Sequence, residues 1–251
     1  MVQKLDKLIA DNQRAQYKEQ EMEITIRESM LQFMQSTINP HFLYNTLEII
    51  NSYAILENNL EISRMARNLA AFFRYSISST QNSVSLADEI KHTLTYLEIQ
   101  KERFETLQVE TNLNEANSGN IPAVRLMVQP LVENSFRHGY DAHLLAPSYI
   151  GIFGREEETH YVVSVCDHGG GMKPEQAAEF EKIFSSLSDD TLETNAQIMQ
   201  RMQHIGLWNV HYRMRLTFGV PYGLHIVSSG QDGTVMEIIL PKGGLQEHGK
   251  L

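Results

Sequence analysis

The chain has 251 residues and a formal net charge of −10 at pH 7, with 42% hydrophobic and 21% charged residues. These proportions are ordinary for a globular protein with one large or two modest domains. The negative charge argues against a nucleic acid as the main partner, because binding to phosphates requires clustered Lys and Arg. The single cysteine, Cys166, excludes an internal disulfide and is typical of a protein of the reducing cytosol.

Residues 1–35 are polar and contain neither Pro nor Gly, which favours a helix. Apolar residues recur every three or four positions at both ends of this segment, and polar residues continue the stripe between them. The pattern predicts a weak coiled coil, in which residues 1–22 form a signalling helix. The alternative is a solvated helix without a partner. The apolar positions are Val2, Leu5, Ile9, Met22, Ile26, Met30 and Phe33.

Residues 36–56 predict a helix that exposes a histidine. His41, Asn45 and Glu48 share one stripe with Ser52, because residues three and four apart lie on the same face. The opposite face is apolar and must be buried. Pro40 removes a backbone donor just before His41, which favours a kink or a new helix start there. By itself, such a histidine is more often an ordinary surface residue.

A second amphipathic helix follows a predicted turn at residues 57–59. Two helices with a short connection make a hairpin that is too thin to bury both apolar faces alone. Pairing with a second copy into a four-helix bundle satisfies both faces. We therefore predict a homodimer through residues 23–80. The inward residues of the second helix are Met65, Leu69, Phe72, Phe73 and Ile77.

From about residue 81 the pattern changes to α+β. Ser85 and Asp88 form a capping-box sequence at the start of a helix that runs to residue 104. The remaining pattern predicts helices on one face of a mixed sheet, an α/β sandwich over residues 81–244. The expected strands are 107–112, 149–155, 160–167, 222–228 and 234–240, and a long helix is expected over about 122–138.

Three stretches of this second part carry candidate ligand-binding residues. In residues 129–139, helical spacing places Glu133, Asn134, Arg137 and His138 on one polar side. An amide oxygen suits Mg²⁺, and the basic side chains suit phosphates. The alternative is a helix end at which basic residues oppose the helix dipole.

The second stretch is a buried strand that ends in Asp167 and three glycines, Gly169 to Gly171, after His168. Glycines let the backbone approach a flat ligand closely, although hairpin turns use the same residues. The third stretch places Gly206 and Leu207 at a helix start, where free backbone amides bind phosphate.

Together and in this order, the three stretches resemble the Bergerat-type ATP fold of histidine kinases, gyrase, Hsp90 and MutL. Residues 39–45, Asn-Pro-His-Phe-Leu-Tyr-Asn, resemble the phosphoacceptor box of sensor histidine kinases of the LytS-like type. This resemblance covers most of residues 28–241. It implies ATP and Mg²⁺ as ligands of the domain at 81–244.

The resemblance also implies a role for each candidate residue. Asn134 would ligate Mg²⁺ beside Glu133, and Arg137 and His138 would reach the phosphates. Asp167 would accept a hydrogen bond from the adenine amino group. Gly169 and Gly171 would shape the base pocket, Gly206 and Leu207 would form the lid hinge, and Thr234 would belong to the closing strand.

The implied reaction is the transfer of a phosphoryl group from ATP to His41 and then to an aspartate of a response regulator receiver domain. Asn45 would orient the imidazole and Glu48 would help to accept its proton. The general base is unassigned, because Phe42 stands where orthodox histidine kinases have an acid. We expect a cytoplasmic chain, linked to a membrane only through a sensor region N-terminal to it.

Two departures from the family pattern leave alternatives open. His204 replaces a lid glycine, and residues 173–203 are a long polar insert, so weak ATP binding and a mobile segment at about 185–203 are expected. One alternative is a Bergerat-fold ATPase without kinase activity, and another is a degenerate dimeric scaffold. A transition-metal site at His138, His168, His204 and His211 is disfavoured, because their spacing forms no paired ligand motif.

Overall fold

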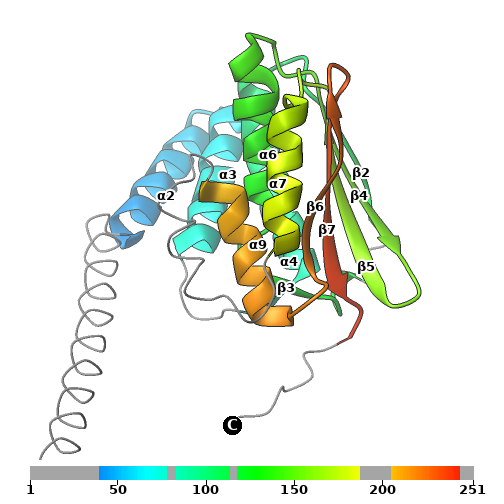
Figure 1. Cartoon of the computed structure of the whole chain (residues 1–251). Coiled ribbons are helices and arrows are strands. Elements are labelled where there is room, and N and C mark those ends of the chain that lie inside the picture. The colour runs from blue at the N-terminus through cyan, green and yellow to red at the C-terminus, as the bar shows by residue number, and fades with distance from the viewer. Residues whose placement is uncertain (1–39, 78–82, 114–117, 187–204, 244–251) are drawn as a thin grey trace, which may run out of the picture.

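The computed structural model describes residues 40–77, 83–113, 118–186 and 205–243. The predicted signalling helix at 1–22, His204 and the lid residues 187–203 lie outside these ranges. Figure 1 shows the two parts of the fold, a helical hairpin and an α/β sandwich, which confirms the predicted fold class. Within the described ranges, no helix is both long and apolar enough to cross a membrane.

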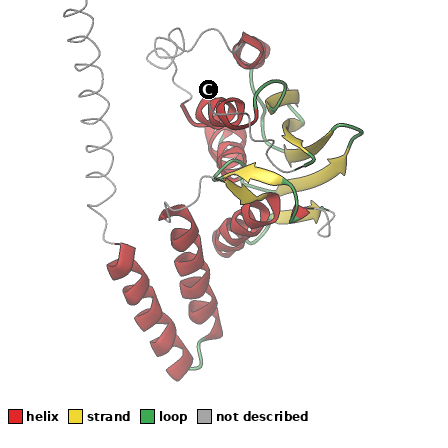
Figure 2. Ribbon diagram, turned by 90° about the horizontal axis from the view of Figure 1, so that it is seen from below, coloured by secondary structure: helices red, strands yellow, loops and turns green. Residues whose placement is uncertain are grey.

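Helices α2 (Pro40–Leu56) and α3 (Leu60–Ile77) form the predicted hairpin, which projects away from the sheet in Figure 2. The turn uses Asn58 in the left-handed conformation, with φ of 54°, which Asn tolerates better than most residues. Asn59 Oδ1 then accepts a hydrogen bond from Ile62 N at 3.1 Å and caps α3. The buried residues of the two helices are mostly small, which lets the helices approach closely: Leu47, Ala54, Ser63, Ala66 and Ala70.

The sandwich is built on a five-stranded mixed sheet with the order β2–β4–β5–β7–β6. Strand β2 runs parallel to β4, and the other neighbours are antiparallel. All five predicted strands are present. The register pairs Asp167, at the end of β5, with Thr234, near the start of β7. The strands are β2 (Gln108–Asn112), β4 (Tyr149–Glu156), β5 (His160–Asp167), β6 (Gly223–Gly230) and β7 (Gly233–Pro241).

Helices cover one face of this sheet (Figure 1). The predicted capping box starts α4, since Ser85 Oγ accepts from Asp88 N at 3.2 Å and Asp88 Oδ2 accepts from Ser85 N at 3.1 Å. The core between the two layers is aliphatic and aromatic, with side chains such as Leu97, Leu131, Ile150, Val163 and Ile238. The helices are α4 (Leu86–Arg103), α6 (Gln129–Asn134), α7 (Pro174–Ser186) and α9 (Ile205–Phe218), with a π-helix η1 (Ser135–Tyr140) and a 3-10 turn η2 (Asp141–His143).

The long helix expected over 122–138 is wrong in its first part. Strand β3 (Pro122–Val124) lies there instead and pairs antiparallel with β1 (Ser83–Ser85). Leu126 then adopts a left-handed conformation, with φ of 54°, which a continuous helix excludes. Helix α6 therefore starts only at Gln129, with Pro130 in its first turn, where a missing N–H breaks no helical hydrogen bond.

The interpretation of residues 173–203 as a polar insert is also wrong for its first part, which forms α7. Phe180 and Phe184 of this helix are buried, and the Phe184 ring stacks on His211 with centroids 4.6 Å apart. Glu181 Oε1 accepts a hydrogen bond from Ile226 N of β6 at 2.7 Å. Helix α7 is thus a packed part of the sandwich.

Candidate functional site

Asp167 ends β5 and lies at the centre of the candidate nucleotide site. Its side chain is buried, and Oδ1 accepts hydrogen bonds from Gly169 N at 2.9 Å and Thr234 N at 3.2 Å. Oδ2 accepts no hydrogen bond from the described part of the chain. A carboxylate with one oxygen fixed and the other open is suited to accept a hydrogen bond from a ligand amine.

Glycines bring two further backbone segments against this carboxylate. A Cβ at Gly139 would lie 3.1 Å from Asp167 Oδ1, and a Cβ at Gly169 would lie 2.4 Å from Gly139 O. Gly171 has φ of +69°, and its Cβ would lie 2.1 Å from Gly230 O. Residues 169–171 therefore pack between η1 and the β6–β7 turn, where a side chain does not fit. The structure thus brings Asp167, Gly169, Gly171 and Thr234 together.

Helices α6 and η1 carry the candidate metal and phosphate ligands. Glu133 and Asn134 end α6, while Arg137 and His138 lie in η1, a π-type turn of a kind often found at functional sites. Glu133 and Arg137 are exposed, and Asn134 and His138 are half-buried. The apolar residues of this segment, Leu131, Val132 and Phe136, are buried, so the four polar side chains lie on its other side.

The oxygen of the Asn134 amide suits Mg²⁺, a hard cation that keeps waters and binds phosphate oxygens. Among the described residues, no group of three or more His, Cys, Asp or Glu could hold a metal ion. Two histidines of the disfavoured metal site, His168 and His211, make other contacts. The His168 ring stacks on Tyr149 with centroids 4.2 Å apart, and His211 Nδ1 accepts a hydrogen bond from Leu224 N at 3.0 Å.

Helix α9 carries the predicted lid hinge. Leu207 is buried, and the buried Trp208 ring stacks on Tyr212 with centroids 4.9 Å apart. Gly206 is exposed, and none of the described residues beyond its own turn of helix has a heavy atom within 4 Å of the position of a Cβ there. The start of α9 is therefore anchored in the core by Leu207 and Trp208, while packing alone does not require glycine at 206.

His41 lies exposed in the first turn of α2. Asn45 Nδ2 lies 3.2 Å from His41 Nδ1, so the amide one turn on contacts the imidazole as predicted. Glu48 is exposed one turn further along the helix. The nucleotide residues lie on α6, η1, β5, β7 and α9, and Figure 1 shows α2 on the side of the molecule away from the sheet.

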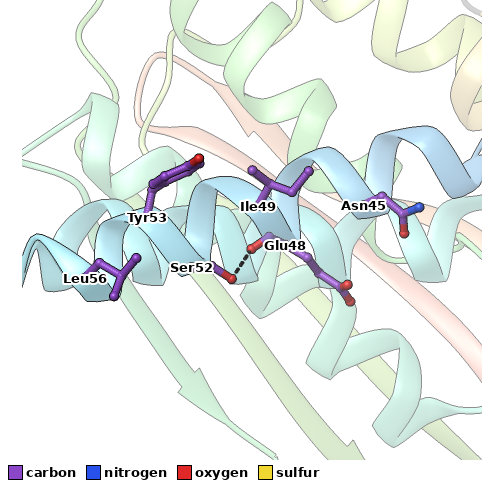
Figure 3. Close-up of a pocket in the computed structure, with 6 residues that line it drawn as sticks. All are labelled: Asn45, Glu48, Ile49, Ser52, Tyr53 and Leu56. Carbon is purple, nitrogen blue, oxygen red and sulfur yellow. Dashed lines mark hydrogen bonds between the residues drawn. The ribbon is translucent and has the colours of Figure 1, made fainter.

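An open groove of about 620 Å³ runs along this stripe of α2 (Figure 3). Its six lining side chains all come from α2 and combine polar with apolar groups: Asn45, Glu48, Ile49, Ser52, Tyr53 and Leu56. The apolar side chains expected on the opposite face of the helix therefore lie next to the polar ones. The exposed fractions of Ile49, Tyr53 and Leu56 are 56%, 66% and 74%. Three large apolar side chains exposed next to one another on a helix indicate an interaction surface.

Comparison with protein families accounts for both parts of the fold. Residues 29–107 match the model described as histidine kinase. Residues 119–244, half of the chain, match the model described as histidine kinase-, DNA gyrase B- and HSP90-like ATPase. The chain belongs to the LytS-like sensor histidine kinases. The second match implies an ATP-binding domain in this kinase chain.

The relatives of this kinase chain are sensor kinases of bacteria. It is 32% identical to the sensor histidine kinase YesM of Bacillus subtilis over 96% of the chain, and 30% identical to the sensor histidine kinase BtsS of Escherichia coli over 90%. An uncharacterized sensor-like histidine kinase of Staphylococcus epidermidis is 29% identical over 88% of the chain. The chain spans 37%, 35% and 40% of the length of these three proteins, respectively.

Three buried polar residues of the kinase chain were not predicted to support the site. Glu89 and His92 lie on α4 and Gln129 starts α6, and their exposed fractions are 0%, 3% and 7%. The sequence does indicate that Glu89 is buried, because it lies between Leu86 and Ile90 on the inward face of a helix. An acid there is buried only if it has partners.

Proposed function

We propose that the chain is the cytoplasmic core of a two-component sensor kinase. It transfers the γ-phosphoryl group of ATP to His41, and from there to an aspartate of a response regulator receiver domain. The observation that carries the proposal is the buried Asp167 carboxylate, whose open Oδ2 lies beside glycines that admit a flat ligand. This arrangement supports recognition of the adenine amino group.

The other candidate residues divide the remaining work. Asn134 holds Mg²⁺ beside Glu133, and Arg137 and His138 offset the charge of the phosphates. Gly206 and Leu207 form the lid hinge at the start of α9, and Thr234 fixes Asp167 through its backbone amide.

At the acceptor, Asn45 selects the tautomer of His41. Its Nδ2 faces His41 Nδ1 at 3.2 Å, and a half-turn of the amide brings its oxygen to that place instead. When the oxygen accepts from Nδ1–H, Nε2 keeps the lone pair that attacks the γ-phosphorus. The nitrogen–phosphorus bond forms as the bond to the β–γ bridging oxygen breaks, and ADP leaves. The proton on Nδ1 then passes to Glu48 or to water.

The exposed apolar face of α2 supports a homodimer as the working unit. A hairpin of two helices leaves Phe42, Ile49, Tyr53 and Leu56 more than half exposed, and a second copy buries them in a four-helix bundle. Dimerisation also offers His41 a nucleotide site in the partner as well as in its own chain.

Incubation with radiolabelled ATP and Mg²⁺ tests the proposal. We expect an acid-labile, alkali-stable phosphoprotein from the wild type, none from His41→Gln, and none from Asn134→Ala. His41→Gln retains ATP binding, because His41 lies outside the nucleotide domain. ATP hydrolysis without phosphohistidine would favour the ATPase alternative, and failure to bind any adenine nucleotide would favour the scaffold.

A further inference from the structure

Glu133, the acid of the proposed nucleotide site, is held by a side chain one turn earlier in α6. Gln129 Nε2 donates a hydrogen bond to Glu133 Oε1 at 2.7 Å. Gln129 is buried, whereas Glu133 is exposed. Residues four apart share a helix face, so the buried amide fixes one oxygen of a long, exposed side chain.

The hydrogen-bonding pattern also determines the orientation of the Gln129 amide. An ionised carboxylate only accepts, so the amide NH₂ faces Glu133 and the amide oxygen faces His92 Nε2 at 2.5 Å. His92 therefore donates from Nε2. Its Nδ1 is buried and has no hydrogen-bond partner among the described residues. Burial lowers the pKa of His92, which keeps the ring neutral.

Two aromatic side chains of α3 stack on the His92 ring. Phe72 stacks on it with centroids 5.0 Å apart and planes at 17°, and Tyr75 stacks with centroids 4.3 Å apart and planes at 24°. The Tyr75 hydroxyl donates to Glu89 at 2.5 Å, and the Arg125 guanidinium lies 4.4 Å from the centre of the Tyr75 ring. The position of the imidazole therefore follows the position of α3.

We propose that His92 and Gln129 are positioning residues that couple α3 to the nucleotide site by fixing the carboxylate of Glu133. This inference rests on the proposed function, since it requires Glu133 to lie beside bound ATP. A shift of α3 moves the two rings and His92 with them, which withdraws the donor that holds Gln129 and releases Glu133. Helix α3 is half of the proposed dimer hairpin. A change in the helical bundle therefore alters the rate of phosphoryl transfer through His92, Gln129 and Glu133, which we call the relay.

The relay acts on the rate of transfer more than on ATP binding. Glu133 is one of several groups around the nucleotide, so binding survives its displacement. Transfer depends on geometry much more steeply, and a misplacement of about 1 Å costs roughly a hundredfold in rate.

The test is a double-mutant cycle on autophosphorylation at saturating ATP, with ATP affinity measured separately. We expect Gln129→Leu to slow labelling roughly ten- to a hundredfold while the ATP dissociation constant stays within about threefold of the wild type. Glu133→Leu should lose at least as much as Gln129→Leu, and the double variant no more than Glu133→Leu alone, because Gln129 acts only through the carboxylate of Glu133. Gln108→Leu, on the exposed strand β2, is the matched control.

A second pair of variants keeps the test decisive if Gln129→Leu does not fold. His92→Gln retains a donor toward Gln129 and should label faster than His92→Leu. Equal rates in these two variants, losses that multiply in the double variant, or an equal loss in Gln108→Leu would each overturn the inference alone. A folded wild type that binds ATP and never labels His41 would instead overturn the proposed function, and the inference with it.

Discussion

The carboxylate of Glu89 on α4 accepts a hydrogen bond from the backbone amide of Met127 at 2.7 Å, 38 residues further along the chain. The same carboxylate accepts from Leu126 N at 2.7 Å, from Val128 N at 3.3 Å and from the Tyr75 hydroxyl. A fully buried charge is thus compensated by four donors. It fixes the backbone that leads into α6, and so the placement of Glu133 and Asn134.

Glu89→Gln is expected to destabilise the protein, because the amide nitrogen points a donor at groups that also donate. Leaving buried groups unpaired costs roughly 2–4 kcal/mol in the free energy of unfolding. Urea denaturation measures this loss. Glu98→Gln on the same helix is the control, since Glu98 is exposed and forms an ion pair with Lys101 at 3.3 Å. Similar losses in the two variants would contradict the role of Glu89.

Asp167→Asn is expected to weaken ATP binding by roughly tenfold to a hundredfold while the fold persists. The Asn oxygen can still accept from Gly169 and Thr234, but an NH₂ group then replaces the open Oδ2 and faces the adenine amine. Equilibrium binding of ATP, with GTP as competitor, measures the effect, and the adenine preference should fall as well. Asp232→Asn, in the exposed β6–β7 turn, is the matched control. Unchanged affinity and base preference in Asp167→Asn would exclude this residue as the adenine ligand.

Gly169→Ala is expected to abolish nucleotide binding, because its Cβ would overlap the backbone at Gly139 and displace the segment beside Asp167. Gly119→Ala provides the control, since in the described part of the chain Gly119 has only its own neighbours within 4 Å of a Cβ position. Isothermal titration with ATP compares the two variants. Wild-type affinity in Gly169→Ala would show that the segment at 169–171 does not form part of the site.

Ile49→Asp is expected to shift the protein from dimer to monomer, because a charge on the apolar face of α2 would be buried without a partner. Val227→Asp on β6 is a matched control, since Ile49 and Val227 are both 56% exposed. Sedimentation velocity at micromolar concentrations distinguishes the two forms. A monomeric wild type would contradict the homodimer, and a dimer that survives in Ile49→Asp would place the interface elsewhere.

The stability of the protein is expected to fall in acid through His211. Burial, followed by the nearby charges of Arg215 and His225, lowers the pKa of His211 to about 3. An unfolded imidazole titrates near its ordinary pKa of about 6.5, so between these values only the unfolded chain binds the proton. The free energy of unfolding therefore falls as the pH falls through this window, by up to about 1.4 kcal/mol per pH unit from this group.

His211→Gln removes that contribution, so its stability should depend less steeply on pH than that of the wild type. Urea denaturation at several pH values between about 7 and 5 compares the two slopes. His92, whose pKa is also lowered, contributes in the same direction in both proteins. Parallel slopes would show that His211 does not carry the effect.

Local sequence patterns predicted the five strands of the sheet, because alternating apolar and polar residues and runs rich in Val and Ile favour a strand without regard to its partners. They failed at 122–128, where Glu89 accepts from the backbone amides of residues 126–128 and is a partner that no local window contains. They failed again at α7, where Phe180 and Phe184 are buried in an otherwise polar segment. The residues around Asp167 were predicted from their motif, whereas Gln129 and His92 acquire their role only from the packing of α3 on α4.

Two aromatic side chains of α3 make the α/β sandwich depend on the helical hairpin for its stability. Phe72 and Tyr75 belong to the hairpin by sequence, yet they complete the interior around His92 and Glu89. Cutting the chain between α3 and β1 would remove these two rings from the α/β sandwich. The His92 imidazole would then be exposed, and the buried Glu89 would lose the Tyr75 hydroxyl as a hydrogen-bond donor. We therefore expect the helical hairpin and the α/β sandwich to unfold in a single cooperative transition. The isolated sandwich should melt at a lower temperature than the whole protein.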